Sequence, residues 1–370
     1  MSREQDPVEL KKTALYEEHV KASAKMVDFG GWLMPVQYSG IIQEHHAVRS
    51  ALGVFDISHM GEVFVSGPGA GAWLNRMLTN NVDRLSVGEG QYTFLLNEEG
   101  GVIDDLLLYR IAAEEFFLVV NASKIEEDVA WLRRHLAEGA SLVDKSEETA
   151  ALAIQGPQTV PFYAALAGGT ALPPRNGIAP VVIDGIEALV CRTGYTGEDG
   201  FEIFFPATDA ARLWRTILEK GGEFGIKPCG LGSRDTLRLE MCYPLNGSDL
   251  SPKRTPLEAG LGFFVDLEKP EFTGRSVLLK QKEEGVKERL VAFTMRDKCP
   301  PPRSHYPVVK DGAVIGETTS GSLSPSLATG IGMAYLPVEH AKVGGEIEID
   351  IRGRHFVAVI GKKPLYRPQA

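Results

Sequence analysis

The sequence has few cysteines and no cysteine motif. Four thiols in 370 residues are too few for a disulfide scaffold, and no two of them form a CxxC pair. We expect each to be a small buried hydrophobic side chain: Cys191, Cys229, Cys242 and Cys299. The histidines form one cluster, His45-His46, and no HExxH motif occurs. We therefore predict that the chain holds no metal site.

Motifs of several large enzyme classes are also missing. The chain contains no GxSxG sequence of the serine hydrolases and no GxxxxGK[ST] loop of the P-loop NTPases. It also has no GxGxxG sequence after a predicted strand, which dinucleotide-dependent enzymes use to approach the pyrophosphate. These three classes of enzyme are therefore disfavoured.

Excess positive charge and long apolar runs are absent as well. The formal net charge is −10, so we expect no nucleic-acid partner. No apolar run approaches the ~18 residues that a membrane helix needs. Residues 1–7 are polar and acidic, with neither the apolar core of a signal peptide nor the arginines of a transit peptide. We predict a cytoplasmic protein that does not contact a membrane.

The residues that are present suit a mixed core with many turns. At ~100–200 residues per domain, the length predicts about two or three domains. The 40 glycines and 22 prolines indicate short strands and loops rather than a helical bundle. Residues 41–52 are predicted as a helix that Ser39 caps. From Leu290 onward, short β-like runs alternate with Gly, Pro and Ser, which predicts a small all-β module.

Two consecutive acids interrupt a predicted strand, Val102–Ile111. Side chains alternate between the two faces of a strand, so Asp105 shares its face with the apolar or aromatic residues from Ile103 to Ile111, while Asp104 points the opposite way. A buried, unpaired carboxylate costs several kcal/mol, so Asp105 should have a partner or a task. The alternative is that both acids lie in a turn and cap its backbone, and the spacing leaves both interpretations open.

Two further segments place charged residues in unusual settings. Residues 192–203 join two predicted strands through three glycines, which lets the backbone approach a ligand closely, and Glu202 follows in the second strand. Residues 230–240 predict a helix with Arg234 in its first turn, where the positive charge opposes the helix dipole unless an anion offsets it. The pattern alone favours a solvated strand face for Glu202 and a surface ion pair for Arg234.

Taken together, these segments resemble the aminomethyltransferase family, the T-proteins of the glycine cleavage system. The matching motifs follow the order of the family along nearly the whole chain: FGGWLMPVQ (29–37), FDISHM (55–60), NEEGGVIDD (97–105), QGP (155–157), RTGYTGEDG (192–200), SRDTLRLE (233–240), TPLEAGLG (255–262) and TSGSLSPS (319–326). Each motif is weak alone, but eight of them in order are specific.

The resemblance implies a fold and a reaction. The fold is α+β, with three small domains around a central folate channel: two interleaved α+β subdomains within residues 1–275 and a C-terminal β-barrel at residues 285–370. The reaction transfers a methylene group from the aminomethyl-lipoyl arm of H-protein to tetrahydrofolate, and it releases ammonia and 5,10-methylenetetrahydrofolate. Lipoylated H-protein is therefore the implied partner and tetrahydrofolate the implied co-substrate.

The resemblance also implies site residues. The key aspartate of the family is the second of its Asp-Asp pair, which is Asp105 here. Positions that contact folate in the family carry over by motif to residues along the whole chain: Met60, Tyr92, Asn121, Tyr195, Glu202 and Arg234. The nearest matches to the C-terminal folate contacts of the family are Tyr366 and Arg367.

One departure and two alternative functions remain. Many members of the family have Leu-Tyr-Gly after the arginine helix, whereas this chain has Leu-Asn-Gly at 245–247. A folate-dependent demethylase of a small methylated substrate shares the size and many of the glycines, although the intact GGVIDD and YTGEDG segments favour aminomethyl transfer. A non-enzymatic folate-binding protein is the other alternative, but its KGCYxGQ motif is not found.

Overall fold

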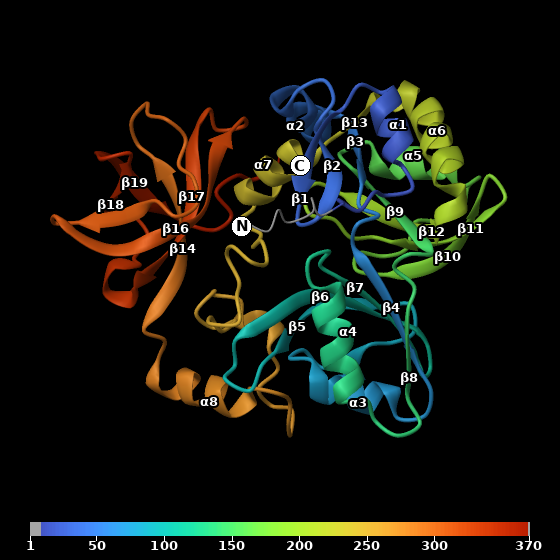
Figure 1. Ribbon diagram of the computed structural model, residues 1–370, viewed down its shortest axis with the longest axis horizontal. Coiled ribbons are helices and arrows are strands. Elements are labelled where there is room, and N and C mark those ends of the chain that lie inside the picture. Colours follow the sequence, from blue (N-terminus) through green and yellow to red (C-terminus); the bar gives the residue numbers. More distant parts are fainter. Residues whose placement is uncertain (1–8, 369–370) are drawn as a thin grey trace, which may run out of the picture.

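The computed structural model describes residues 9–368, so the polar segment 1–7 lies outside the described residues. It confirms the α+β class and the C-terminal barrel. Figure 1 shows three bodies: the orange and red barrel, a sheet with green and yellow helices, and a blue to cyan sheet below it. Within the described chain, no helix combines the length and the apolar composition needed to cross a membrane.

One sheet is made from a continuous piece of the chain, residues 61–144. Its strands lie in the order β5-β6-β7-β4-β8, with these bounds: β4 Gly61–Ser66, β5 Gly90–Leu96, β6 Val102–Ala112, β7 Glu115–Val120 and β8 Ser141–Asp144. Helices α3 (Ala70–Met77) and α4 (Ile125–Arg134) cover one face, and they bury apolar residues such as Trp73 and Leu132 against it. No helix covers the opposite face of this sheet among these elements, and the candidate active site described below lies on that face.

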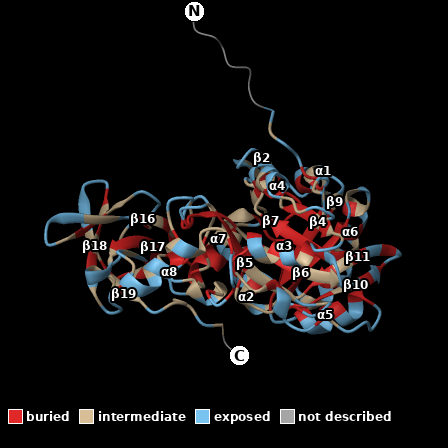
Figure 2. Cartoon of the chain, turned by 90° about the horizontal axis from the view of Figure 1, so that it is seen from below, coloured by how far each residue is buried: buried red, intermediate tan, exposed pale blue. Residues whose placement is uncertain are grey.

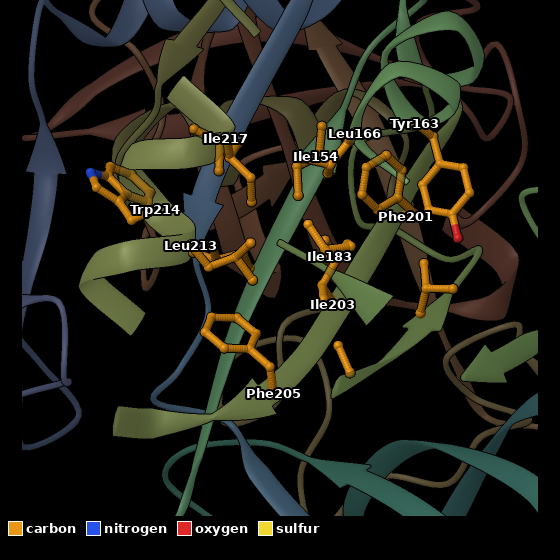
Figure 3. Close-up of a cluster of buried hydrophobic side chains, with 14 of the residues drawn as sticks. Ile154, Tyr163, Leu166, Ile183, Phe201, Ile203, Phe205, Leu213, Trp214 and Ile217 are labelled. Atoms are coloured by element: carbon orange, nitrogen blue, oxygen red, sulfur yellow. The ribbon is translucent and has the colours of Figure 1, made fainter. Parts of the chain in front are cut away.

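A second sheet is assembled from segments on both sides of that piece. Its order is β10-β11-β12-β9-β3-β13, with these bounds: β3 Leu52–Asp56, β9 Thr149–Gln155, β10 Ile178–Ile183, β11 Ile186–Cys191, β12 Gly200–Pro206 and β13 Ile226–Pro228. Helices α5 (Thr159–Leu166) and α6 (Ala210–Gly221) cover its outer face. Figure 3 shows this core, where Phe201, Ile203 and Trp214 pack together. The two sheets are thus interleaved in sequence.

The uncovered faces of the two sheets pack against each other. The ring of Phe117 on β7 lies 5.0 Å from the ring of Phe204 on β12, edge to face. The hydroxyl group of Tyr109 on β6 lies 2.9 Å from that of Thr193, which follows β11. Apolar residues from both sheets form one cluster around these contacts. Side chains that point inward near the end of this interface therefore meet between two sheets, shielded from water.

The remaining elements before the barrel surround this pair of sheets. They are α1 Tyr16–Lys21, β1 Lys25–Phe29, β2 Trp32–Gln37, α2 Ile41–Ser50 and α7 Leu231–Glu240. Short 3₁₀ turns cover Val82–Arg84, Ala207–Asp209, Gly222–Phe224 and Gly262–Phe264, and one more, Val338–His340, lies within the C-terminal barrel. Strands β1 and β2 form a separate antiparallel pair.

The start of α2 corrects the sequence prediction. The N-cap residue is Gly40, and no side-chain cap is formed, so the predicted cap by Ser39 is wrong. The buried carboxylate of Glu44 replaces it by accepting from the backbone N–H groups of Tyr38 (2.6 Å) and Gly40 (3.1 Å). It also accepts from the N–H group of Gly230 at 2.8 Å, at the start of α7. One carboxylate thus caps two helix N-termini, where its charge is favourable.

The C-terminal strands close into a barrel. Helix α8 (Arg275–Glu284) leads into it, and the strands are β14 Glu288–Met295, β15 Pro307–Lys310, β16 Ala313–Ser324, β17 Thr329–Pro337, β18 Glu346–Ile351 and β19 Arg354–Gly361. The all-β texture from Leu290 onward is therefore explained by a barrel without free sheet edges. The exact domain limits, 1–275 and 285–370, stay a prediction.

Helix α7 connects the barrel with the other two bodies. It contacts β16 on one side and α2 and β2 on the other, and most of its second half is buried, as Figure 2 shows. Its last residue, Glu240, accepts hydrogen bonds from Arg49 of α2 and from Ser324 and Ser326 of the barrel. A buried charged junction therefore fixes the barrel to the rest of the molecule.

Candidate active site

Strand β6 presents Asp105 toward the second sheet. Asp104 and Asp105 both lie within the strand, so the interpretation that they cap a turn is wrong. Leu107 and Tyr109 pack with the inter-sheet cluster on the side of Asp105, as alternation predicts. Ile103 differs, because it packs into the core under the helices. The reason is a register shift of β5 between Leu95 and Leu96, which alters the start of the β5–β6 pairing.

Three donors surround the carboxylate of Asp105. The Tyr92 hydroxyl donates to Oδ2 at 2.7 Å, and the side-chain amides of Asn121 and Asn246 donate to Oδ1 at 3.2 and 3.3 Å. Burial and the neighbouring charge of Asp104 nevertheless raise the pKa of Asp105 to about 7. A carboxyl group with this pKa exchanges its charge near neutral pH, which suits proton transfer or the stabilisation of a cation.

The strand register brings Asn121 and Met60 next to Asp105. Leu107 pairs with Val119 and Gly61 pairs with Val120, so Asn121 follows β7 beside Asp105 and Met60 precedes β4 beside Asn121. Met60 packs against the inter-sheet cluster. A flexible thioether and an amide thus line the same side of the carboxylate.

Glu202 lies on the facing strand, β12, and it is only 6% exposed. The predicted solvated strand face is therefore wrong. The Thr193 hydroxyl donates to its carboxylate at 2.6 Å. Burial raises the pKa of Glu202, although this hydrogen bond and the charge of Arg234 act in the other direction. Glu202 is a desolvated acceptor held in place by one hydroxyl.

Arg234 in the first turn of α7 also differs from the sequence prediction of a surface ion pair. Its guanidinium carbon lies 4.9 Å from the ring centre of Tyr195, in a cation–π arrangement. Nη1 is buried and has no hydrogen-bond partner within residues 9–368. The acids near it pair elsewhere, because Asp235 binds Arg238 and Glu240 binds Arg49.

Tyr366 contacts Arg49 of α2 and the last residue of α7. The Tyr366 ring covers the guanidinium group of Arg49 at 4.5 Å, and its backbone N–H donates to the carbonyl of Glu240 at 3.1 Å. Arg367 is exposed. No interaction in the described part of the chain joins either residue to Asp105, so their role stays a prediction.

Sequence reasoning missed two residues of the site. Thr193 links Glu202 to Tyr109 by hydrogen bonds of 2.6 and 2.9 Å, and its position inside the glycine-rich loop was the available signal. Asn246 donates to Asp105, and its Oδ1 is buried without a partner among residues 9–368. It occupies the position where the sequence departs from the family motif, which was the signal in that case.

The arrangement fits a flat, polar ligand. Glu202 offers a desolvated acceptor, and the orphaned Nη1 of Arg234 offers a donor that needs a partner. Met60, Tyr92 and Tyr195 supply apolar and aromatic surface for the faces of a ring. Asp105 on β6 can hold a negative charge beside a reacting atom.

Two family models match the chain. The GCVT N-terminal domain covers residues 15–269, and the glycine cleavage T-protein C-terminal barrel domain covers residues 288–367.

Relatives match along their full length. The chain is 48% identical over 364 residues to a protein named aminomethyltransferase from Desulfitobacterium hafniense, with 98% of this chain and 99% of that protein covered. It is 47% identical over 361 residues to an aminomethyltransferase of Geobacillus kaustophilus, with 97% and 99% covered. The crystal structure of glycine cleavage system aminomethyltransferase T from Bartonella henselae superposes with a TM-score of 0.91 at 34% identity, covering 97% of this chain and 99% of that one.

Proposed function

Because the chain belongs to the glycine cleavage T-protein family of aminomethyltransferases, we propose that Asp105 is its catalytic carboxylate and that the Glu202–Arg234 pair holds its folate. The enzyme moves the methylene carbon of an aminomethyl group from the lipoyl arm of H-protein to tetrahydrofolate, with release of ammonia. A demethylase and a non-enzymatic folate binder have no support in these matches. The observation that carries the assignment of Asp105 is the set of three donors around its carboxylate, in a setting where burial and the charge of Asp104 raise its pKa.

Folate binding is supported by the chemistry of the residues. Tetrahydrofolate, when bound, supplies the two nitrogen atoms that take up the methylene carbon. Its pterin edge carries N–H donors, which Glu202 accepts, while Arg234 donates through the otherwise unpaired Nη1 to a carbonyl or carboxylate oxygen. Met60, Tyr92 and Tyr195 cover the ring faces.

Asp105 acts at the reacting end. In its ionised form it stabilises the positive charge that develops on the methylene carbon as ammonia leaves. Tyr92 and Asn121 hold the carboxylate in one orientation through their hydrogen bonds of 2.7 and 3.2 Å, so little reorganisation is needed during the reaction. Water exclusion between the two sheets strengthens the charge interaction.

H-protein is the proposed macromolecular partner. Its lipoyl arm must reach Asp105 for the methylene carbon to be transferred, so we propose that the arm enters the space between the two sheets. We expect a partner of acidic character to dock on a local basic patch, since the chain as a whole carries a net charge of −10.

Replacing Glu202 by glutamine tests the folate assignment. The substitution keeps the shape and the contact with Thr193, but it removes the charge that accepts from the pterin. We expect the Kd for tetrahydrofolate to rise by about 10- to 100-fold, since a hydrogen bond to a charged group contributes about 1.5–3 kcal/mol. Isothermal titration calorimetry on the purified enzyme measures this.

The matched control is Glu187→Gln, an exposed glutamate on the neighbouring strand β11. It should leave the Kd unchanged. If Glu202→Gln bound tetrahydrofolate as tightly as the unmodified enzyme while remaining folded by circular dichroism, Glu202 would not be a ligand of the pterin.

A further inference from the structure

Asp128 on α4 is a buried acid that the proposed mechanism does not use. Its side chain is fully buried, and neither carboxyl oxygen receives a hydrogen bond from an amide, hydroxyl or cation of residues 9–368. Its neighbour is another acid, Asp104, whose charge adds to burial in raising the pKa of Asp128, and two facing carboxyl groups can form a hydrogen bond only when one of them is protonated. Asp104 is also fully buried and directly precedes Asp105 in β6.

Two touching carboxyl groups in this setting share one proton. Burial raises the pKa of both groups, and the charge of one further opposes ionisation of the other. The proton resides on Asp128, because Asp104 receives two other hydrogen bonds: the Asn121 backbone N–H donates to its Oδ2 at 3.0 Å, and the Asn121 side-chain amide donates to its Oδ1 at 2.8 Å. Asp128 is therefore a hydroxyl donor and Asp104 an ionised acceptor.

Asn121 connects this pair to the catalytic carboxylate. The same amide nitrogen that donates to Asp104 lies 2.9 Å from the backbone carbonyl of Asp105 and 3.2 Å from its Oδ1. The amide is thus oriented by Asp104 on the helix side of the sheet and contacts Asp105 on the other side. A continuous set of hydrogen bonds runs from Asp128 through Asp104 and Asn121 to Asp105.

We propose that Asp128 is a positioning residue for aminomethyl transfer: its hydroxyl group holds the Asp104 carboxylate, which in turn holds the Asn121 amide against Asp105. This proposal rests on the proposed role of Asp105. The acid pair also acts electrostatically, because the negative charge that stays on Asp104 lies next to Asp105 in β6. That charge helps to hold the pKa of Asp105 near 7.

Other charged and titratable groups around this set have smaller effects. On α4, Glu127 raises and Lys124 lowers the pKa of Asp128, and these two side chains pair with each other at 2.7 Å at the surface. On the inner face, Tyr92 contacts Asp105, and the Tyr195 hydroxyl lies in the same site. After burial, the charge of Asp104 therefore has the largest effect on the pKa of Asp105, and that charge depends on the proton that Asp128 holds.

Two substitutions at Asp128 separate positioning from mere packing. Asp128→Asn keeps the size and provides an N–H donor, so we expect kcat within about 3-fold of the unmodified enzyme and the same acidic limb in the pH profile of kcat. Asp128→Ala removes the donor. Asp104 then takes the proton itself, accepts less well from Asn121, and no longer carries charge behind Asp105. We expect kcat to fall roughly 10-fold or more, and the acidic limb to move to lower pH.

A neighbouring substitution and a spectroscopic measurement complete the test. Glu127→Ala on the exposed side of α4 should change neither kcat nor the pH profile. The infrared difference spectrum between the unmodified enzyme and Asp128→Asn at pH 9, where Asp105 is ionised, should contain a protonated-carboxyl C=O band that belongs to Asp128, and this readout holds even if the alanine variant does not fold.

Three results would overturn the proposal: an unchanged kcat and acidic limb in folded Asp128→Ala, an equal loss in Asp128→Asn, or the absence of the infrared band. These results differ from a failure of the proposed function. If Asp105 were not the catalytic carboxylate, Asp105→Asn would keep its kcat, whatever the kcat of the Asp128 variants.

Discussion

Asp105→Asn is expected to lower kcat by about 10²- to 10⁴-fold, the range typical for removal of a charged catalytic group. Asparagine keeps the shape of the side chain, so the contacts with Tyr92 and Asn121 can persist in part. It cannot carry the negative charge that stabilises the cation formed as ammonia leaves. Because none of the hydrogen bonds of Asp105 among residues 9–368 involves Glu202 or Arg234, the Kd for tetrahydrofolate should stay within about 3-fold.

The measurement is ammonia release in a coupled assay with lipoylated H-protein, glycine decarboxylase and tetrahydrofolate, together with calorimetry for folate binding. The pKa of Asp105 is about 7, so kcat of the unmodified enzyme should fall as the pH drops below about 7, and the variant should lack this limb. Asp184→Asn in the exposed β10–β11 turn serves as the control and should be fully active. Near-normal turnover in Asp105→Asn would exclude a catalytic role for this carboxylate.

The second large effect concerns stability at the junction of the barrel. Glu240→Gln should lower the free energy of unfolding by about 2–4 kcal/mol, because it removes one of the two carboxylates, Glu240 and Glu198, that balance the buried charge of Arg49. Glu240 is fully buried, and its Oε2 binds Arg49 at 2.8 Å. His45 also lies next to it, but burial lowers the pKa of His45, so it is a neutral hydrogen-bonding group and Arg49 is the counter-charge.

The pH dependence of unfolding gives an independent readout. Burial opposes the charge of Glu240, but the hydrogen bonds from His45, Ser324 and Arg49 outweigh it and lower its pKa to about 2. A carboxyl group with a depressed pKa in the folded state stabilises above its ordinary pKa near 4.5 and loses that contribution as the pH falls toward 2. The difference corresponds to about 3 kcal/mol.

The free energy of unfolding, measured with denaturant, should therefore decrease less from pH 7 to pH 3 in Glu240→Gln than in the unmodified protein. Glu284→Gln at the end of α8 is the control, since this exposed glutamate forms a single ion pair among residues 9–368, with Lys280 at 3.9 Å. It should change the stability by less than about 0.5 kcal/mol. Equal stability of the two variants at pH 7 would show that the junction contributes little.

The local sequence pattern was sufficient to predict Asp105, the part of the site that a single strand positions. Asp105 was identified because alternation along β6 places a single carboxylate on an apolar face, and the strand forms as expected. The all-β texture from Leu290 onward likewise indicated the barrel. In both cases the signal lies within one short stretch of sequence.

The rest depends on contacts between distant segments. The pattern favoured a solvated face for Glu202, but the facing sheet buries it through Tyr109 and Thr193, which are 84 residues apart. Arg234 was assigned a surface partner, yet Tyr195 and the neighbouring loop cover it. The interleaving of the two sheets rests on pairings such as that of β3 with β13, which no local motif encodes.

The interleaved sheets impose an order on synthesis at the ribosome. Residues 61–144 contain every strand of their sheet, so this unit can fold as soon as it emerges. Strand β3, whose residues are all buried in the finished protein, must wait for β9 and finally for β13. At ~5–20 residues per second, the last partner arrives roughly 10 to 30 s later. During this interval the nascent chain carries an apolar segment ahead of an already folded unit, which makes that segment the natural target of a chaperone.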